Sequence, residues 1–131
     1  MSTTKTIRLR WWERLGVVHA HPLNIVSHTV LLPLLSYFMW QHNLLLALLL
    51  GYIPVVGGVL FTYLRWTDKP SLSLAEQWLY KRATRLNSAL AFAAVVIFSY
   101  ALWVHDVPML VGVLLATLLL AIFGVTRNAV G

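Results

Sequence analysis

Long apolar runs alternate with short polar breaks along this chain, and their lengths predict four membrane-spanning helices. Between Leu15 and Leu64 there is no Asp, Glu, Lys or Arg. Because roughly 20 apolar residues cross the hydrocarbon core of a bilayer, this run is long enough for two spans. Its most polar point is the Gln-His-Asn stretch at 41–43. The pattern therefore predicts one helix over 22–40 and a second over 44–64, joined by a tight turn.

The second half of the chain repeats this pattern after a polar connection. We expect a helix over 86–104, a tight turn at 105–108 and a last helix over 109–126, which Arg127 closes. Within the connection at 65–85, Ser73-Leu-Ala-Glu76 is typical of a capping box that opens a helix. This basic, amphipathic helix is expected to run on into the third span. Pro33 is expected to kink or loosen the first span.

The chain is thus predicted to be a single integral membrane domain, an all-α four-helix transmembrane bundle made of two tandem hairpins. Its parts are an interfacial N-terminal segment (1–21), a first hairpin (22–64), a cytoplasmic amphipathic connection (65–85) and a second hairpin (86–127). The N-terminal segment mixes arginines with Trp11 and Trp12. That mixture favours a short helix in the headgroup region, although a simple flank of the first span would look the same.

Composition and charge support a membrane location. Of 131 residues, 60% are hydrophobic and 11% are charged, too few polar residues to cover a soluble domain of this size. All ten Lys and Arg fall in the N-terminal segment, the connection and the C-terminus. By the positive-inside bias, both termini are cytoplasmic, and we expect a multi-pass protein of a prokaryotic cytoplasmic membrane. The net charge of +6 does not predict a nucleic-acid partner, because the cations flank apolar runs.

A shift of 63 residues aligns the two hairpins. The stretch Ser36–Asn43 then falls on Ser99–Asp106, with Ser, Tyr, Trp and His matching, and Asn24 falls on Asn87. One explanation is duplication of a two-helix unit, which would give parallel repeats about a pseudo-twofold axis along the membrane normal. The other is convergence, because helix ends at the same interface select Tyr, Trp and a polar turn.

Histidines gather where the N-terminal segment meets the first span. His21, Asn24 and His28 are spaced by three and four residues, so they share one face of a helix, and His19 lies just before it. Histidine is a common ligand of iron, zinc and copper, so the cluster could hold a metal or relay a proton. Alternatively, His19 and His21 lie in the wet interface and only His28 is buried. The candidate metal ligands are His19, His21 and His28, with Asn24, Asp68 and Glu76 in support.

The remaining aromatic and histidine positions fit interfacial roles. His42 and His105 occupy equivalent outer turns, across the membrane from the first cluster, and are expected to be polar caps. The tryptophans flank the spans as aromatic anchors do: Trp11, Trp12, Trp40, Trp66, Trp78 and Trp103. Cysteine is absent, which excludes disulfides and thiol nucleophiles, and no phosphate-binding loop or hydrolase elbow is present.

The residues His19, His21, Pro22, Asn24, His28 and Pro33 form a pattern that resembles the first motif of a family of small membrane Fe(II)-dependent dioxygenases. Those enzymes oxidise 2-hydroxy fatty acids, and the resemblance implies that His19 and His28 would be iron ligands. The second motif of that family is not intact, because the stretch at 61–71 keeps Lys69-Pro70 but lacks its His and Glu. The overall layout is also similar to a family of prokaryotic four-span proteins of no known activity.

Two classes of function follow from these patterns. The first is a non-catalytic accessory, assembly or lipid-interacting protein, whose partners would be the bilayer and a larger membrane protein or further copies of the chain. The second is a histidine-dependent Fe(II) enzyme that oxidises a lipid chain at the cytoplasmic face. A small transporter or proton-relay protein is a third hypothesis, although the predicted spans contain no acidic residue.

Overall fold

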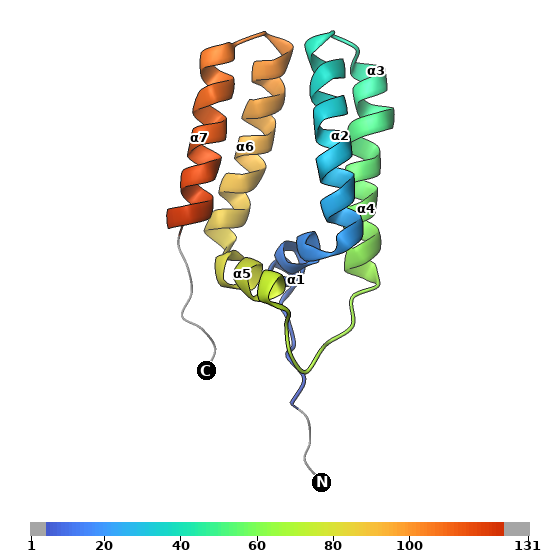
Figure 1. Cartoon of the computed structure of the whole chain (residues 1–131), viewed down its shortest axis with the longest axis vertical. Helices are drawn as coiled ribbons and strands as arrows, with labels where there is room; N and C mark the ends of the chain where they lie inside the picture. Colours follow the sequence, from blue (N-terminus) through green and yellow to red (C-terminus); the bar gives the residue numbers. More distant parts are fainter. Residues whose placement is uncertain (1–4, 125–131) are drawn as a thin grey trace.

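The structure is a computed structural model that describes residues 5–124, and its regular elements in that range are helices. Four long helical rods stand side by side, and two short helices lie across one end (Figure 1). We call the end with the short helices the base and the end with the two tight turns the tip. In chain order the elements are α1 (Trp11–Val17), η1 (Val18–Ala20), α2 (Pro22–Trp40), α3 (Leu44–Ala47), η2 (Leu48–Tyr52), α4 (Ile53–Leu64), α5 (Leu74–Arg82), α6 (Arg85–Trp103) and α7 (Val107–Phe123).

The first hairpin has the predicted bounds, for reasons that lie in its caps and prolines. Pro22 occupies the first turn of α2, where a missing N–H leaves no bond unmade. The tip turn ends where Asn43 Oδ1 accepts the backbone N–H of Leu46 at 3.1 Å. Elements α3, η2 and α4 together form the second rod. The π-helical turn η2 lies just before Pro54, and such a turn relieves the clash that proline makes with the preceding turn. Helix α2 remains helical through Pro33.

The second hairpin corrects one prediction. The helix of the connection, α5, does not run on into the third span but stops at Arg82. Ala83 leaves the helical conformation, and Thr84 then caps a new helix by accepting the N–H of Asn87 at 3.1 Å. The break allows α5 to lie across the base while α6 rises toward the tip (Figure 1). Helix α7 ends at Phe123, and Arg127, expected to close it, lies outside the described residues.

Three rods are long and apolar enough to cross a membrane: Pro22–Trp40, Leu44–Leu64 and Arg85–Trp103. The fourth, α7, is an apolar helix of 17 residues. At a rise of about 1.5 Å per residue, α7 is roughly 25 Å long, near the lower limit for a span. The structure is therefore consistent with a membrane protein, and side chains exposed along the rods are predominantly apolar.

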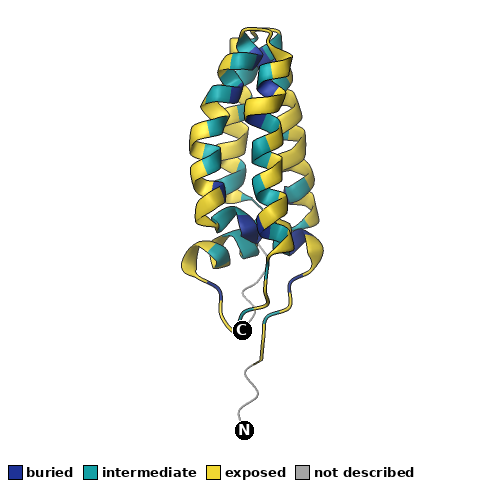
Figure 2. Cartoon of the chain, turned by 90° about the vertical axis from the view of Figure 1, so that its right-hand side faces the viewer, coloured by how far each residue is buried: buried dark blue, intermediate teal, exposed yellow. Residues whose placement is uncertain are grey.

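The main helix contacts run in the order α7, α6, α2, α4, and the second rod also meets α6 through the bond of Tyr52 to Ser99. Buried residues concentrate near the tip and at the base, whereas exposed and half-buried residues dominate the rods between them (Figure 2). The tip core contains Leu35, Met39, Ala47 and Leu102. Gly51 allows the first two rods to approach closely there, because a Cβ at this position would lie 2.6 Å from Leu35 Cβ.

Equivalent features of the two halves recur at the 63-residue shift. Helices α2 and α6 begin and end at positions that differ by this number. Asp106 caps α7 by accepting from Met109, as Asn43 caps α3. The residues that precede these caps, His42 and His105, both have left-handed backbones, with φ of 55° and 58°. At the base, Glu13 accepts the N–H of Arg10, and Glu76 accepts that of Ser73, both at 2.8 Å.

Candidate functional site

The structure brings two of the three candidate histidine ligands together at the base. His19 lies in η1 and His28 one and a half turns into α2, and their ring centroids are 5.4 Å apart. His19 Nδ1 lies 2.8 Å from the carbonyl oxygen of Leu15, and His28 Nδ1 is bonded to that of Asn24. Because a carbonyl can only accept, each Nδ1 must carry a proton, so Nε2 is the nitrogen of each ring that could bind a metal.

The surroundings of His19 favour its neutral form. Burial lowers the pKa of His19, and the nearby His28 lowers it further, against the hydrogen bonds to the Leu15 and Gly16 carbonyls, which raise it. A neutral imidazole whose Nδ1 is fixed by a backbone carbonyl is the usual state of a metal-ligating histidine. It is equally the state of a half-buried histidine that bonds only to protein.

The other members of the predicted cluster lie elsewhere. His21 is exposed and caps α2, because its Nδ1 accepts the N–H of Leu23 at 3.1 Å. Glu76 forms an ion pair with Lys69 at 2.7 Å, and Asp68 is exposed on the connection. Within residues 5–124, no three His, Asp or Glu side chains are grouped so that they could share a metal ion. The histidine pair therefore has no acidic third ligand from the described part of the chain.

Asn24 is fully buried, and its role in this structure is to hold the base together. Its Nδ2 donates to the Val18 carbonyl at 2.7 Å and to Thr62 Oγ1 at 2.8 Å. These bonds join the turn before α2 to the last turns of α4. Gly58 makes room for the amide, since a Cβ at that position would meet Asn24 Oδ1 at 3.2 Å. Asn87, the counterpart in α6, donates from Nδ2 to the Arg82 carbonyl at 2.9 Å.

At the tip, histidines and tryptophans of the two hairpins make reciprocal contacts. His42 packs against Trp103 with ring centroids 4.7 Å apart, and His105 packs against Trp40 at 4.2 Å. The two imidazoles meet edge to face at 4.8 Å. His105 Nε2 also lies 2.8 Å from the carbonyl oxygen of Trp40. These histidines are thus part of the contact between hairpins as well as polar residues in turns.

The remaining expected anchors have different surroundings. Trp11 is exposed, whereas Trp12 is buried and lies under the guanidinium groups of Arg10 and Arg85. Trp78 is partly exposed and lies under Arg82, whose Nε donates to the Ala121 carbonyl near the end of α7 at 2.7 Å. Several of these tryptophans therefore pair with cations at the base in addition to flanking the spans.

Two polar features, one hydrogen bond and one cavity, could not be predicted from the sequence. Tyr52 donates to Ser99 and is a polar link between the hairpins at the level of the rods. A cavity beside the end of α4 is lined by Arg65, Trp66 and Lys69, which the sequence indicates only as topology-marking cations and an aromatic anchor. The one available signal is that two cations fall within the first five residues after Leu64. Comparison with protein-family models, curated proteins and solved structures found no match to this chain.

Proposed function

We propose that the chain is a four-span integral membrane protein without a complete active site of its own, which acts as an accessory or assembly partner within a membrane. The observation that carries this proposal is the apolar surface that the rods expose. All four rods expose large apolar side chains, so much of the surface of the bundle is left for other molecules to cover. Lipid can cover this surface, and so can helices of a larger membrane protein or of a second copy.

The use of the polar side chains supports the same proposal. Asn24 and Thr62 bond to each other and to backbone carbonyls, and Tyr52 bonds to Ser99. Hydroxyl groups of Thr29, Ser36 and Thr117 bond to the carbonyl four residues earlier in their own helices. These groups therefore stabilise the rods and their contacts rather than presenting a set of reactive atoms.

A photo-crosslinking side chain at an exposed rod position tests the accessory role. Phe92 in α6 and Leu115 in α7 are 73% and 55% exposed. In native membranes, both positions should give a crosslinked product larger than the monomer, from a second membrane protein or a second copy. Thr67, exposed on the connection, serves as the control for nonspecific capture. Recovery of the monomer alone from both rod positions would refute the accessory role.

The proposed topology places both termini and the base on the cytoplasmic side and the tip outside. The chain contains no cysteine, so single cysteines can report each face without further engineering. Gln41→Cys at the tip should react with a membrane-impermeant maleimide in intact cells. Thr67→Cys at the base should react only after the membrane is opened. The reverse pattern would invert the topology, and protection of neither site would contradict four spans.

We infer that the two hairpins arose by duplication. Support comes from the equal bounds of α2 and α6, the paired turns and caps, and the reciprocal contacts of His42 with Trp103 and His105 with Trp40. Reciprocal contacts between equivalent residues are what a twofold relation between two units produces. Superposition of the two hairpins at this register, with α2 on α6 and the second rod on α7, tests the inference, and a different best register would refute it.

A metal-dependent activity is the second candidate, because of the geometry of His19 and His28. Imidazole nitrogens bind metals at about 2.0–2.1 Å, which places the centroids of two ligands of one ion roughly 5 Å apart. The observed separation is 5.4 Å, with both Nε2 atoms available. Elemental analysis of the purified protein tests this candidate. Stoichiometric iron that is lost in both His19→Ala and His28→Ala would support it, and absence of metal at saturating Fe(II) would exclude it.

A further inference from the structure

A cavity of about 300 Å³ opens at the base, between the end of α4 and the connection that follows it. Its walls include two cations, Arg65 and Lys69, and four further uncharged side chains with hydrogen-bonding groups, His21, Thr62, Trp66 and Thr67. Glu76 is the one acidic side chain among the lining residues. The question is whether this carboxylate would repel an anion from the cavity.

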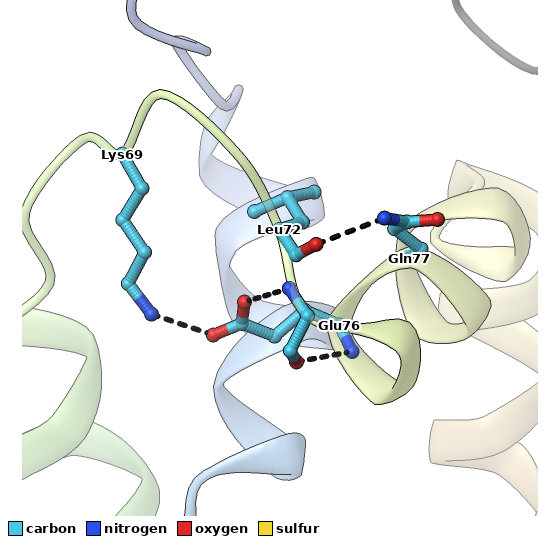
Figure 3. Close-up of polar contacts among 5 residues, drawn as sticks. Lys69, Leu72, Glu76 and Gln77 are labelled. Atoms are coloured by element: carbon cyan, nitrogen blue, oxygen red, sulfur yellow. Dashed lines mark hydrogen bonds and ion pairs between the residues drawn. The ribbon is translucent and has the colours of Figure 1, made fainter.

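Glu76 is already engaged by protein groups on both of its oxygens. Oε1 accepts from Lys69 Nζ at 2.7 Å, and Oε2 accepts the backbone N–H of Ser73 at 2.8 Å (Figure 3). Although partial burial raises its pKa, the bonds from Lys69 and Ser73 and the charge of Lys69 together lower it. Glu76 therefore stays ionised, neutralises Lys69 and holds its ammonium at the cavity wall.

Arg65 supplies the net positive charge of the cavity. The Lys69–Glu76 pair is the one salt bridge found among residues 5–124, so the exposed guanidinium of Arg65 has no carboxylate partner there. Arg65 lies over the ring of Phe61, with the guanidinium carbon 5.1 Å from the ring centroid. A guanidinium held in this way still offers planar donors that match two oxygens of a phosphate group.

Trp66 forms part of the cavity wall and holds Lys69 in place. The Lys69 ammonium lies over the indole ring, with Nζ 4.8 Å from the ring centroid. Together with the bond to Glu76, this contact keeps a second cation at the wall of the cavity beside Arg65. The indole Nε1 is closed off from solvent, so it is not a donor to a ligand in the cavity.

The position of the cavity favours a lipid over a free anion. Arg65 directly follows Leu64, the last residue of α4, so the cations lie at the level where the span ends. On the same helix, Leu60 and Leu64 are 53% and 72% exposed. An acyl chain can lie along these leucines while its headgroup occupies the cavity. Basic pockets beside spans on the cytoplasmic side are typical sites for anionic headgroups.

We propose that this cavity binds the phosphate headgroup of an anionic phospholipid, with Arg65 as the main charge partner and Lys69 and Thr67 as further donors. The proposal rests on the membrane location proposed above. It assigns the base a ligand class.

The test is lipid binding to the detergent-purified protein, measured by native mass spectrometry with phosphatidylglycerol and, separately, phosphatidylcholine. Wild type should retain phosphatidylglycerol preferentially. Arg65→Gln should weaken phosphatidylglycerol binding about tenfold and leave phosphatidylcholine binding unchanged, because it removes one charge-assisted contact. Lys81→Gln is the matched control, since Lys81 is exposed on α5 outside this cavity.

Three outcomes would overturn the proposal. Equal losses in Arg65→Gln and Lys81→Gln would show general surface attraction. Equal retention of both lipids by the wild type would show no headgroup site. Displacement of phosphatidylglycerol by inorganic phosphate at similar concentration would show a site for free anions. Elution of Arg65→Gln at the wild-type volume excludes misfolding as the cause. Cysteine labelling tests the membrane topology separately, so failure of the lipid site can be distinguished from failure of the proposed topology.

Discussion

Replacement of Gly51 by alanine is expected to push apart the first two rods near the tip. The added Cβ would lie 2.6 Å from Leu35 Cβ and 2.9 Å from its Cγ and Cδ1. Carbon atoms in contact are normally about 3.5–4.0 Å apart, so the rods must separate by roughly 1 Å. Leu35 cannot move aside easily, because it is 3% exposed and belongs to the tip core.

The size of the effect follows from two opposing terms. Overpacking of a buried contact destabilises by about 1–3 kcal/mol. Alanine in place of a helical glycine stabilises by about 0.5–1 kcal/mol, because the unfolded chain loses freedom. We therefore expect a net loss of about 1–2 kcal/mol for Gly51→Ala. Gly57, in the same rod, and Gly112, in α7, have no atom within 4 Å of the added Cβ. Their alanine variants should keep only the favourable term.

The assay is unfolding in mixed micelles with increasing sodium dodecyl sulfate, followed by circular dichroism. The midpoint for Gly51→Ala should fall below wild type, and those for Gly57→Ala and Gly112→Ala should equal or exceed it. Because the three changes are chemically identical, helix propensity and hydrophobicity cannot explain a difference in sign. If Gly51→Ala is as stable as Gly57→Ala, the close approach of Leu35 to the second rod is refuted.

Three further predictions concern the base. Because the pKa of His19 is lowered in the folded protein, its contribution to stability should be complete above about pH 6.5 and fall as the pH drops below that value. His19→Gln should therefore lose less melting temperature than wild type between pH 8 and 5.5, and parallel curves of melting temperature against pH would contradict this. Asn24→Ala removes the bonds to Val18 and Thr62 and should lower the free energy of unfolding by about 2–3 kcal/mol in the same micelle titration. A change below about 0.5 kcal/mol would show that these bonds do not stabilise the base. Ser73→Ala removes the cap that accepts from Glu76 and should lower the melting temperature by the equivalent of about 1 kcal/mol, while Ser71→Ala, exposed outside α5, should not.

Much of the local structure could be predicted from residue order because it depends on short-range causes. The bounds of the first two rods follow from hydropathy, from Pro22 at a first turn and from the cap at Asn43. The capping box at Ser73 likewise involves only residues within one turn of each other. The prediction that α5 continues into α6 was wrong, because helix propensity through Ala83 says nothing of the direction in which each helix must pack.

The candidate site was less predictable, because it depends on which segments meet. Spacing on a helix placed His21 and His28 on one face, yet His28 lies against His19, while His21 is used as a cap. The contact arises because η1 turns the chain back toward α2. Nothing in the order of residues indicates that Asn24 reaches Thr62 across 38 positions.

Residue order by itself therefore determined where apolar helices begin and end, where the cations fall, and that the halves resemble each other at a shift of 63. These properties are local, since hydropathy and caps act over one or two helical turns. The tertiary structure decided that His42 and His105 exchange tryptophan partners, that the two hairpins meet along α2 and α6, and that Arg65 and Trp66 share a cavity beside the end of α4. Such juxtapositions depend on packing between distant segments, where a glycine such as Gly51 or a break such as Ala83 sets how closely and in which direction helices meet.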